Sequence, residues 1–373
     1  MRTVAGLTKG CATPSVTVNH LGNGQRMGLF NRARTTVGLD IGSGLIKVAV
    51  VSHGSGQPVL SRVGMAPVVD DAIVEGEVMD PGIVAEAIRG LFQEMGIKPK
   101  HVVTAVGGRD VIVKRIPMDR MKESEARELI RWEAEQHVPF DMDNVELDFQ
   151  ILDPENEGLQ MSVLLVAAKR ELVETKMSLL KDIGLDPSVI DVDAFALHNA
   201  FEVNYPDAMK GIVGLVNIGH ELTNVNVLDE GVPVLTRDLP VGTRRFREDL
   251  QRERGLSAEE AEKVLQGFEV TEALQPFLQS RGEELAVGIE RAAAFLQTAS
   301  RSSAGLSRMY LSGGGARIPG IAKVLSDRLK LPVQLANPIE RIQVAEGVFD
   351  QLSVDEVAPL LMLPVGLALR QAA

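Results

Sequence analysis

The chain has 373 residues, with 39 Lys plus Arg and 51 Asp plus Glu, which gives a formal net charge of −12 at pH 7. This acidic balance argues against a nucleic-acid-binding protein, because the attraction to phosphate that dominates such binding would have the wrong sign overall. The length predicts two or three domains of about 150 residues each, and the single cysteine, Cys11, excludes a disulfide framework.

Residues 1–33 are rich in Gly, Thr, Asn and Ser and follow neither a helical nor a strand period. This composition is typical of a disordered tail, which is what we expect for this segment. Met27 stands just before the first strong strand pattern, and it offers an alternative start of translation.

The first strong pattern, at residues 38–50, is a pair of apolar strands joined by a glycine turn. Asp40 stands at the end of the first strand and can hold a hydrated Mg²⁺ through water. Lys47, in the second strand, brings a positive charge that can attract a phosphate. Glycine turns leave backbone N–H groups open to an anion because no Cβ blocks the approach. The candidate binding residues of this turn are Gly42, Ser43 and Gly44.

Residues 214–227 repeat this pattern. Aligned on the shared Ile-Gly pair, Asn217 matches Asp40 and Asn224 matches Lys47. The strand that follows repeats as well, since residues 233–237 match 58–62. Two matches in the same order at nearly the same offset indicate a duplicated unit. Two such turns facing each other would hold a polyphosphate from both sides. The candidates in the second copy are Asn217, Gly219, His220 and Thr223.

A helix is predicted to begin after Ser257, because Ser257 and Glu260, three residues later, match the capping-box pattern. Glu260 and Lys263 then lie on one helix face. In isolation such a pair is most often exposed to solvent.

Three consecutive glycines follow an apolar strand at 309–311 and precede a helical pattern at 321–329. No Gly-Lys-Ser/Thr follows, which excludes a P-loop, and the spacing of a dinucleotide fingerprint is absent. Glycines at this point let a ligand lie against the backbone near a helix N-terminus. The candidate residues are Gly313, Gly314, Gly315 and Arg317.

No apolar run in the sequence reaches the roughly 18–20 residues that span a bilayer. The nearest, residues 357–369, is interrupted by Pro359 and Pro364 and predicts a buried segment. We therefore expect no direct membrane span.

These elements, in this order, resemble the actin-like ATPase superfamily, and within it the PilM family of type IV pilus assembly, which is similar in fold to FtsA. The resemblance runs from about Met27 to the C-terminus. It is most specific at residues 37–43, 138–140, 148–152, 166–169, 217–219 and 236–238. It implies an α/β fold: a duplicated, ribonuclease H-like, two-domain ATPase with an FtsA-like inserted subdomain.

The resemblance also implies ATP and Mg²⁺ in the cleft between the domains, with Asp40 holding the metal through water. Glu260 and Lys263 take the positions of a pair that contacts the ribose and base. Asp193 takes the position of an acidic residue near the attacking water, so Asp40 and Asp193 are the candidates for catalysis. Asn217 stands where the superfamily usually has Asp, and an amide carries no charge. We therefore expect ATP binding with slow or partner-dependent hydrolysis.

The domain division that follows from the resemblance makes domain 1 discontinuous. Its expected parts are 34–98, 186–211 and a C-terminal return at 345–373. Residues 99–185 are expected to form the inserted, partner-binding subdomain, and residues 212–344 are expected to form domain 2.

The resemblance implies a cytoplasmic protein, peripheral to the inner membrane through its partners, with a role in twitching motility. The main expected partner is the N-terminal tail of a PilN-like inner-membrane protein, bound in a groove between domain 1 and the insertion, partly as an added strand. Other pilus assembly proteins, including motor ATPases, are further expected partners, and self-association stays open.

Two alternatives remain at this stage. One is a small-molecule kinase of the same superfamily, although the sequence has no corresponding sugar-binding motif. The other is a structural scaffold whose nucleotide site has decayed, which Asn217 motivates.

Overall fold

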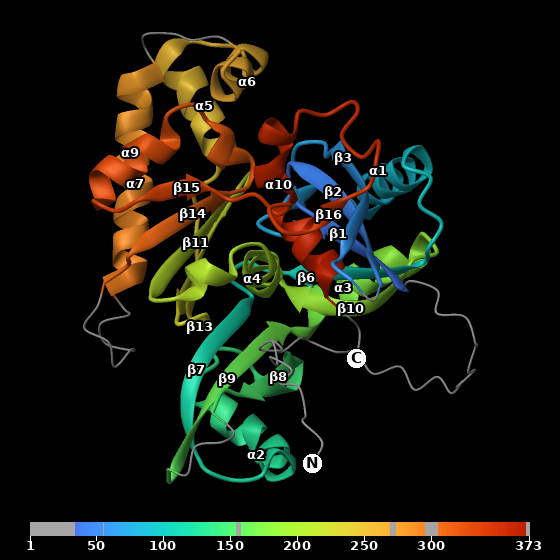
Figure 1. Cartoon of the computed structure of the whole chain (residues 1–373), viewed down its shortest axis with the longest axis vertical. Coiled ribbons are helices and arrows are strands. Elements are labelled where there is room, and N and C mark those ends of the chain that lie inside the picture. The colour runs from blue at the N-terminus through green and yellow to red at the C-terminus, as the bar shows by residue number, and fades with distance from the viewer. Residues whose placement is uncertain (1–33, 55, 154–157, 269–273, 295–304, 371–373) are drawn as a thin grey trace, which may run out of the picture.

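The computed structural model describes residues 34–370, except 55, 154–157, 269–273 and 295–304 (Figure 1). The expected tail at 1–33 and the alternative start at Met27 lie outside the described residues. In the described part of the chain, no helix has both the length and the apolarity that a membrane crossing requires.

The first sheet has six strands in the order β10-β6-β1-β2-β3-β16. Strands β1, β2 and β3 form an antiparallel meander. Strand β6 adds in parallel beside β1, and β10 adds in parallel beside β6. Their bounds are β1 (Arg34–Ile41), β2 (Leu45–His53), β3 (Val59–Pro67), β6 (His101–Val106), β10 (Asp186–Val192) and β16 (Gln343–Val344). Near this sheet lie a short hairpin, β4 (Ile73–Val74) and β5 (Glu77–Val78), and helix α1 (Pro81–Glu94).

The second sheet has five strands in the order β13-β12-β11-β14-β15 and opens with the same kind of meander. Its strands are β11 (Ile212–Ile218), β12 (Thr223–Asp229), β13 (Val232–Leu239), β14 (Arg308–Ser312) and β15 (Val333–Leu335). Its helices are α5 (Thr243–Arg254), α6 (Ala258–Gln266), α7 (Leu274–Ala294), α9 (Ile321–Leu329) and the short η3 (Gly314–Arg317).

The predicted duplication is confirmed by strand register. In the first hairpin Asp40 stands opposite Lys47, and in the second Asn217 stands opposite Asn224. The residues that the sequence alignment matched therefore occupy equivalent positions in the two hairpins.

A third sheet, in the order β7-β9-β8, forms the insertion below the two domains (Figure 1). Its elements are β7 (Val111–Asp119), α2 (Glu123–Glu135), η1 (Met142–Asn144), β8 (Val145–Ile151) and β9 (Gln160–Lys169). These elements have a core of their own, which includes Ile130, Phe149 and Leu165.

The expected limits of the insertion, 99–185, are too wide. Strand β6 lies in the first sheet between β1 and β10, and its apolar run is buried because a central parallel strand is covered on both faces. Helix α3 (Arg170–Asp182) packs Leu179 and Leu180 into the core of the first sheet. The chain also returns to the first sheet slightly before residue 345, since β16 pairs with β3.

The apolar segment near the end of the sequence forms α10 (Val354–Leu369), in which every residue from Val357 to Ala368 is buried. It packs against β1, β2 and the helix α4 (Asp193–Asn204). Two glycines permit this close approach. A Cβ on Gly38 would lie 2.1 Å from the Pro364 carbonyl oxygen, and one on Gly366 would lie 1.8 Å from that of Ala196.

The two domains share one apolar core. It contains Val103 of the first sheet, Leu215 of the second, and residues of α4 and α10. The rings of Phe201, Tyr205 and Tyr310 meet there with centroids 4.7 to 5.1 Å apart. The short helix η2 (Pro206–Met209) follows α4 and leads into the second sheet.

The glycine contacts generate a stability prediction. Gly38→Ala is expected to lower the free energy of unfolding by about 1–3 kcal/mol, because the methyl group overpacks the contact between β1 and α10. Gly90→Ala is the matched control: a Cβ there meets nothing within 4 Å in helix α1, and we expect a gain of about 0.5–1 kcal/mol. Urea unfolding followed by circular dichroism measures both, and equal effects of the two variants would contradict the packing argument.

Candidate functional site

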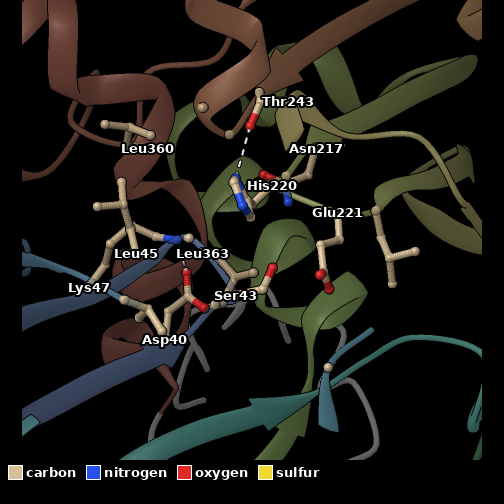
Figure 2. A pocket seen from close by; sticks show the side chains of 18 of the residues that line it. Asp40, Ser43, Leu45, Lys47, Asn217, His220, Glu221, Thr243, Leu360 and Leu363 are labelled. Carbon is tan, nitrogen blue, oxygen red and sulfur yellow. Dashed lines mark hydrogen bonds and ion pairs between the residues drawn. The ribbon is translucent and has the colours of Figure 1, made fainter. Parts of the chain in front are cut away.

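A cavity of about 470 Å³ lies between the domains, with both hairpin turns on its wall (Figure 2). The sequence-predicted site residues that line it are Asp40, Gly42, Ser43, Gly44, Lys47, Asp193, Asn217, Gly219, His220, Gly313, Gly314 and Arg317. Thr223, Glu260, Lys263 and Gly315 are not among the lining residues. The cavity therefore gathers most of the residues singled out in the sequence from four separate segments.

The two hairpin turns are built alike. The N–H of Gly42 donates to the Leu45 carbonyl at 3.2 Å, and that of Gly219 donates to the Leu222 carbonyl at 2.9 Å. Each of these glycines thus closes its own turn, and the N–H groups at the turn tips are the better candidates for an anion. The tips touch, because a Cβ on Gly44 would lie 2.8 Å from the His220 ring.

The ion pair of the first hairpin lies inside the cavity. Lys47 Nζ is 2.5 Å from Asp40 Oδ2, and both side chains are largely buried. In the second hairpin, Asn217 and Asn224 replace this pair with neutral amides. The Asn224 amide donates instead to Asp238 at 2.8 Å, so the second copy draws its carboxylate from the next strand.

The glycine loop packs on the end of β11. Gly313 has a φ of +83°, and a Cβ there would lie 2.4 Å from the Ile218 carbonyl oxygen. A Cβ on Gly315 would lie 2.1 Å from the Ile218 side chain. Gly315 therefore serves the packing of the loop beneath the cavity, and Gly313 and Gly314 are left on the cavity wall.

Helix α6 begins with the predicted capping box: Ser257 Oγ accepts from the Glu260 N–H, and the Glu260 carboxylate accepts from the Ser257 N–H. This use of the Glu260 side chain directs it away from the cavity. Lys263 pairs with Glu259 at 2.7 Å instead of facing the cavity. The residues of α6 that line the cavity are Glu262, Leu265 and Gln266.

Thr223, a candidate nucleotide-binding residue in the sequence, has a structural role. Its side chain is fully buried, and its hydroxyl donates to the Val241 carbonyl at 2.6 Å. This bond fixes the segment that leads into α5.

Lys176 of α3 is a lining residue that the sequence reasoning missed. Its Nζ donates to the Ala105 carbonyl at 2.6 Å, at the buried floor of the cavity. Burial lowers the pKa of Lys176, and the carboxylates of Asp193 and Asp40 partly oppose that shift. One signal for it exists in the sequence: Lys176 falls on the buried face of α3, in step with Val173 and Leu180.

The carboxyl groups at the cavity floor titrate unusually. Burial raises the pKa of Asp193 to about 7, although the Lys176 ammonium lowers it in part. Burial also raises the pKa of Asp238, against the hydrogen bond from Asn224. A carboxyl group with a pKa near 7 can accept or release a proton at neutral pH, which suits general base chemistry.

His220 is half-buried at the tip of the second hairpin. Its Nδ1 is 3.3 Å from the Thr243 hydroxyl, and its Nε2 is 4.0 Å from Asp70. Desolvation, aided by the nearby Arg247, lowers the pKa of His220. The ring therefore faces the cavity mainly as a neutral, hydrogen-bonding group at neutral pH.

The donor set suits a hydrated Mg²⁺ better than a dehydrated metal. No cluster of three or more metal-binding side chains occurs among the residues that the structure describes. Mg²⁺ keeps most of its waters and usually takes one or two carboxylates. Asp40 fits this role, because its Oδ1 lies beside the Gly42 turn while its Oδ2 meets Lys47.

Two sheets that each turn a duplicated hairpin toward one cleft define an actin-like ATPase fold. The chain is similar to the ethanolamine utilization protein EutJ from Carboxydothermus hydrogenoformans, with 19% identity, a TM-score of 0.52, and coverage of 90% of this chain and 89% of that chain. This likeness shows the fold alone.

A closer similarity is to a solved PilM-PilN type IV pilus biogenesis complex. The identity is 30% and the TM-score 0.79, over 91% of this chain and 98% of that chain. A family model described as Type IV pilus assembly protein PilM matches residues 38–372. The chain therefore belongs to the PilM family of type IV pilus assembly proteins, which confirms the resemblance inferred from the sequence.

The electrostatics at the floor of the cavity can be tested directly. Lys176→Met is expected to raise the pKa of Asp193 above its value of about 7, because it removes the cation that favours the charged carboxylate. Carboxyl-carbon NMR of the full chain over a pH series measures this pKa. Lys98→Met, which removes an exposed lysine that is not among the cavity-lining residues, is the control. An unchanged or lower Asp193 pKa in the Lys176 variant would contradict the assignment.

Proposed function

We propose that the cleft binds ATP together with a hydrated Mg²⁺. The observation that carries this proposal is the convergence of both hairpin turns and the glycine loop on one cavity. The tips of the two turns would bind the phosphates, and Gly313 and Gly314 would lie against the nucleoside. Glu262, which lines the cavity from α6, would take the nucleoside-contacting role that the resemblance implies for Glu260.

The charges around the cavity support a metal ion beside the phosphates. The lining carboxylates, Asp40, Asp70, Asp193, Glu221, Asp238 and Glu262, outnumber the lining cations, Lys47, Lys176, Arg247 and Arg317. A triphosphate in such surroundings needs a further positive charge, and a bound cation is the largest local charge in such a site. Asp40 would hold the Mg²⁺ through water.

Catalysis would depend on Asp193 as the base that takes a proton from the attacking water, since its pKa of about 7 suits that role. Asn217 brings no charge to the opposite hairpin. We therefore propose slow hydrolysis, or hydrolysis that a partner stimulates. Closure of the cleft around the nucleotide would then change the conformation of a surface that a partner binds.

The partner that we propose is the cytoplasmic N-terminal tail of a PilN-like inner-membrane protein, which would keep this chain cytoplasmic and peripheral to the membrane. Support comes from the similar PilM-PilN complex and from an open sheet edge. In the described chain β8 pairs with β9 alone, and an unpaired edge can accept an added strand. Glu146 of β8 meets Arg170 of α3 at 2.8 Å, so this edge adjoins domain 1.

Nucleotide binding can be tested by calorimetric titration of the full chain with ATP, with and without Mg²⁺. We expect binding to be tighter with Mg²⁺ than without it. In Asp40→Asn we expect this gain in affinity to shrink by about tenfold, because the carboxylate proposed to hold the hydrated metal is lost. Asp327→Asn, which removes an exposed carboxylate of α9, should bind like the wild type. No heat with wild-type protein at sub-millimolar ATP would favour the decayed-scaffold alternative.

Partner binding can be tested by amide hydrogen exchange of the full chain with a synthetic tail peptide of the PilN-like protein. We expect slower exchange in β8 (Val145–Ile151) and no change in the distant α9 (Ile321–Leu329). Protection that spares β8 would contradict the proposed edge. A deletion of 99–185 is unsuitable for this purpose, because it would remove β6 from the first sheet.

A further inference from the structure

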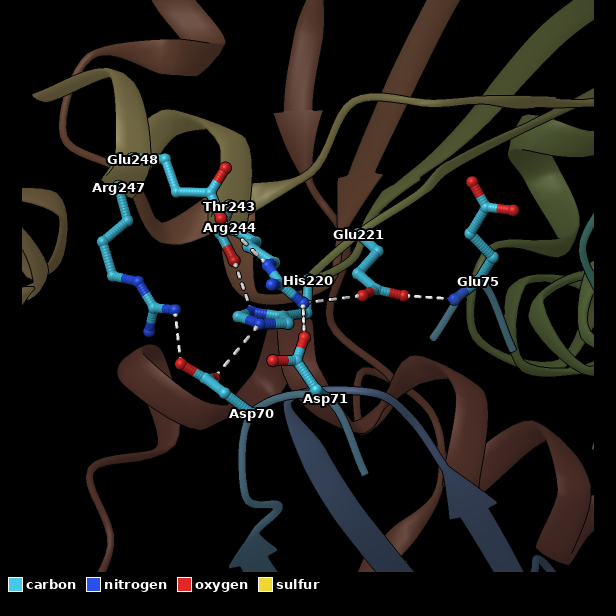
Figure 3. A network of polar contacts seen from close by, with 9 residues as sticks. All are labelled: Asp70, Asp71, Glu75, His220, Glu221, Thr243, Arg244, Arg247 and Glu248. Atoms are coloured by element: carbon cyan, nitrogen blue, oxygen red, sulfur yellow. Dashed lines mark hydrogen bonds and ion pairs between the residues drawn. The ribbon is translucent and has the colours of Figure 1, made fainter. Parts of the chain in front are cut away.

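A network of charged side chains crosses the cleft at the hairpin tips (Figure 3). From the first domain come Asp70, Asp71 and Glu75, and from the second come Glu221, Arg244 and Arg247. Arg247 meets Asp70 at 2.9 Å, and Arg244 meets Asp71 at 2.8 Å. The Glu75 N–H donates to Glu221 at 2.5 Å.

Both ends of the Asp70–Arg247 pair are tied to a hairpin tip. The N–H of Val68, two residues before Asp70, donates to the Gly44 carbonyl at 3.1 Å. The N–H of Arg244, one helical turn before Arg247, donates to the His220 carbonyl at 2.8 Å. The pair therefore joins the two turns that the proposed function assigns to phosphate, and both of its side chains line the cavity.

The two arginines differ in how far their donors are satisfied. Arg244 lies between three carboxylates, of Asp71, Glu221 and Glu248, at 2.8 to 3.2 Å. Arg247 has the single ion pair with Asp70, and its buried Nε has no hydrogen-bond partner among the described residues. A guanidinium has five N–H donors. Arg244 uses its Nε and Nη1 on three carboxylates, whereas Arg247 uses only its Nη2 on Asp70. Arg247 also lines the cavity and Arg244 does not, so Arg247 is the arginine with donors to spare at the cavity wall.

The loop that carries Asp70 is held in a costly conformation. Asp71 and Glu75 have φ angles of +66° and +50°, in the left-handed region that side chains other than glycine seldom adopt. Such residues cost free energy and gather at ligand clamps and switch regions. Both of them contact the second domain, so the strain lies in the segment that faces Arg247.

We propose that Arg247 binds the terminal phosphate of the nucleotide, and that Asp70 competes with this phosphate for the same guanidinium. The inference rests on the proposed nucleotide site and adds a phosphate ligand from α5, outside both hairpins. A phosphate between the tips would draw Arg247 from Asp70, so nucleotide binding would loosen this contact between the domains.

Competition predicts opposite signs for the two single variants. Arg247→Gln should weaken binding of a non-hydrolysable ATP analogue with Mg²⁺ by about tenfold or more, since a charge-assisted hydrogen bond is lost. Its affinity for AMP, which lacks the terminal phosphate, should change less than twofold. Asp70→Asn should raise the affinity for the ATP analogue by roughly two- to fivefold, which corresponds to the strength of an exposed ion pair. Calorimetry on the full chain measures all of these affinities.

The double variant separates competition from simple repulsion between Asp70 and phosphate. If Asp70 acts through Arg247, Asp70→Asn has no effect in the Arg247→Gln background. Asp71→Asn is the matched control, because Asp71 carries the same charge one residue away but pairs with Arg244. This variant should leave the affinity for the ATP analogue unchanged or lower it.

Three outcomes overturn the inference alone. Both single variants lower the affinity for the ATP analogue, Arg247→Gln lowers the affinity for AMP as much as that for the ATP analogue, or the gain in affinity from Asp70→Asn persists in the double variant. If wild-type protein binds neither the ATP analogue nor inorganic tripolyphosphate, the proposed function fails along with the inference. The two failures are thus told apart by the wild-type titration.

Discussion

The close approach of α10 to β1 and α4 is the constraint on which the rest of the structure depends. Gly38 and Gly366 leave no room for a side chain, so the helix axis is held against the strand that carries Asp40. The same helix accepts the Gly313 N–H at the Pro359 carbonyl, at 2.8 Å. One buried helix thus positions the first hairpin and the glycine loop together. Its Leu360 and Leu363 also form part of the cavity wall (Figure 2).

The sequence was sufficient to predict those elements that depend on neighbouring residues alone. Alternating apolar residues around a glycine turn predict each hairpin, and the duplication shows that the two hairpins are related. The Ser257 capping box likewise depends on neighbouring residues alone, and it stands as predicted. Strand register then followed, because a shift of one residue would move the apolar side chains to the wrong face.

The sequence was insufficient where tertiary contacts decide. Lys176 reaches the cavity from α3, and no local pattern places that helix beside the hairpins. Helix α6 carries Glu260 and Glu262 two positions apart, and only the structure shows which of the two lines the cavity. The capping box occupies Glu260, so Glu262 is the one that faces the cavity. The outer limits of the insertion were wrong for a similar reason: only the sheet order shows that β6 separates β1 from β10.

The position of α10 in the chain has a consequence for how the protein is made. The first sheet is synthesised early, but the helix that covers one of its faces follows the whole second domain in sequence. Domains usually fold as units while the ribosome extends the chain. Here apolar residues of β2 and β3 stay exposed until α10 has been synthesised and can cover them. The second domain can therefore fold before the first is complete.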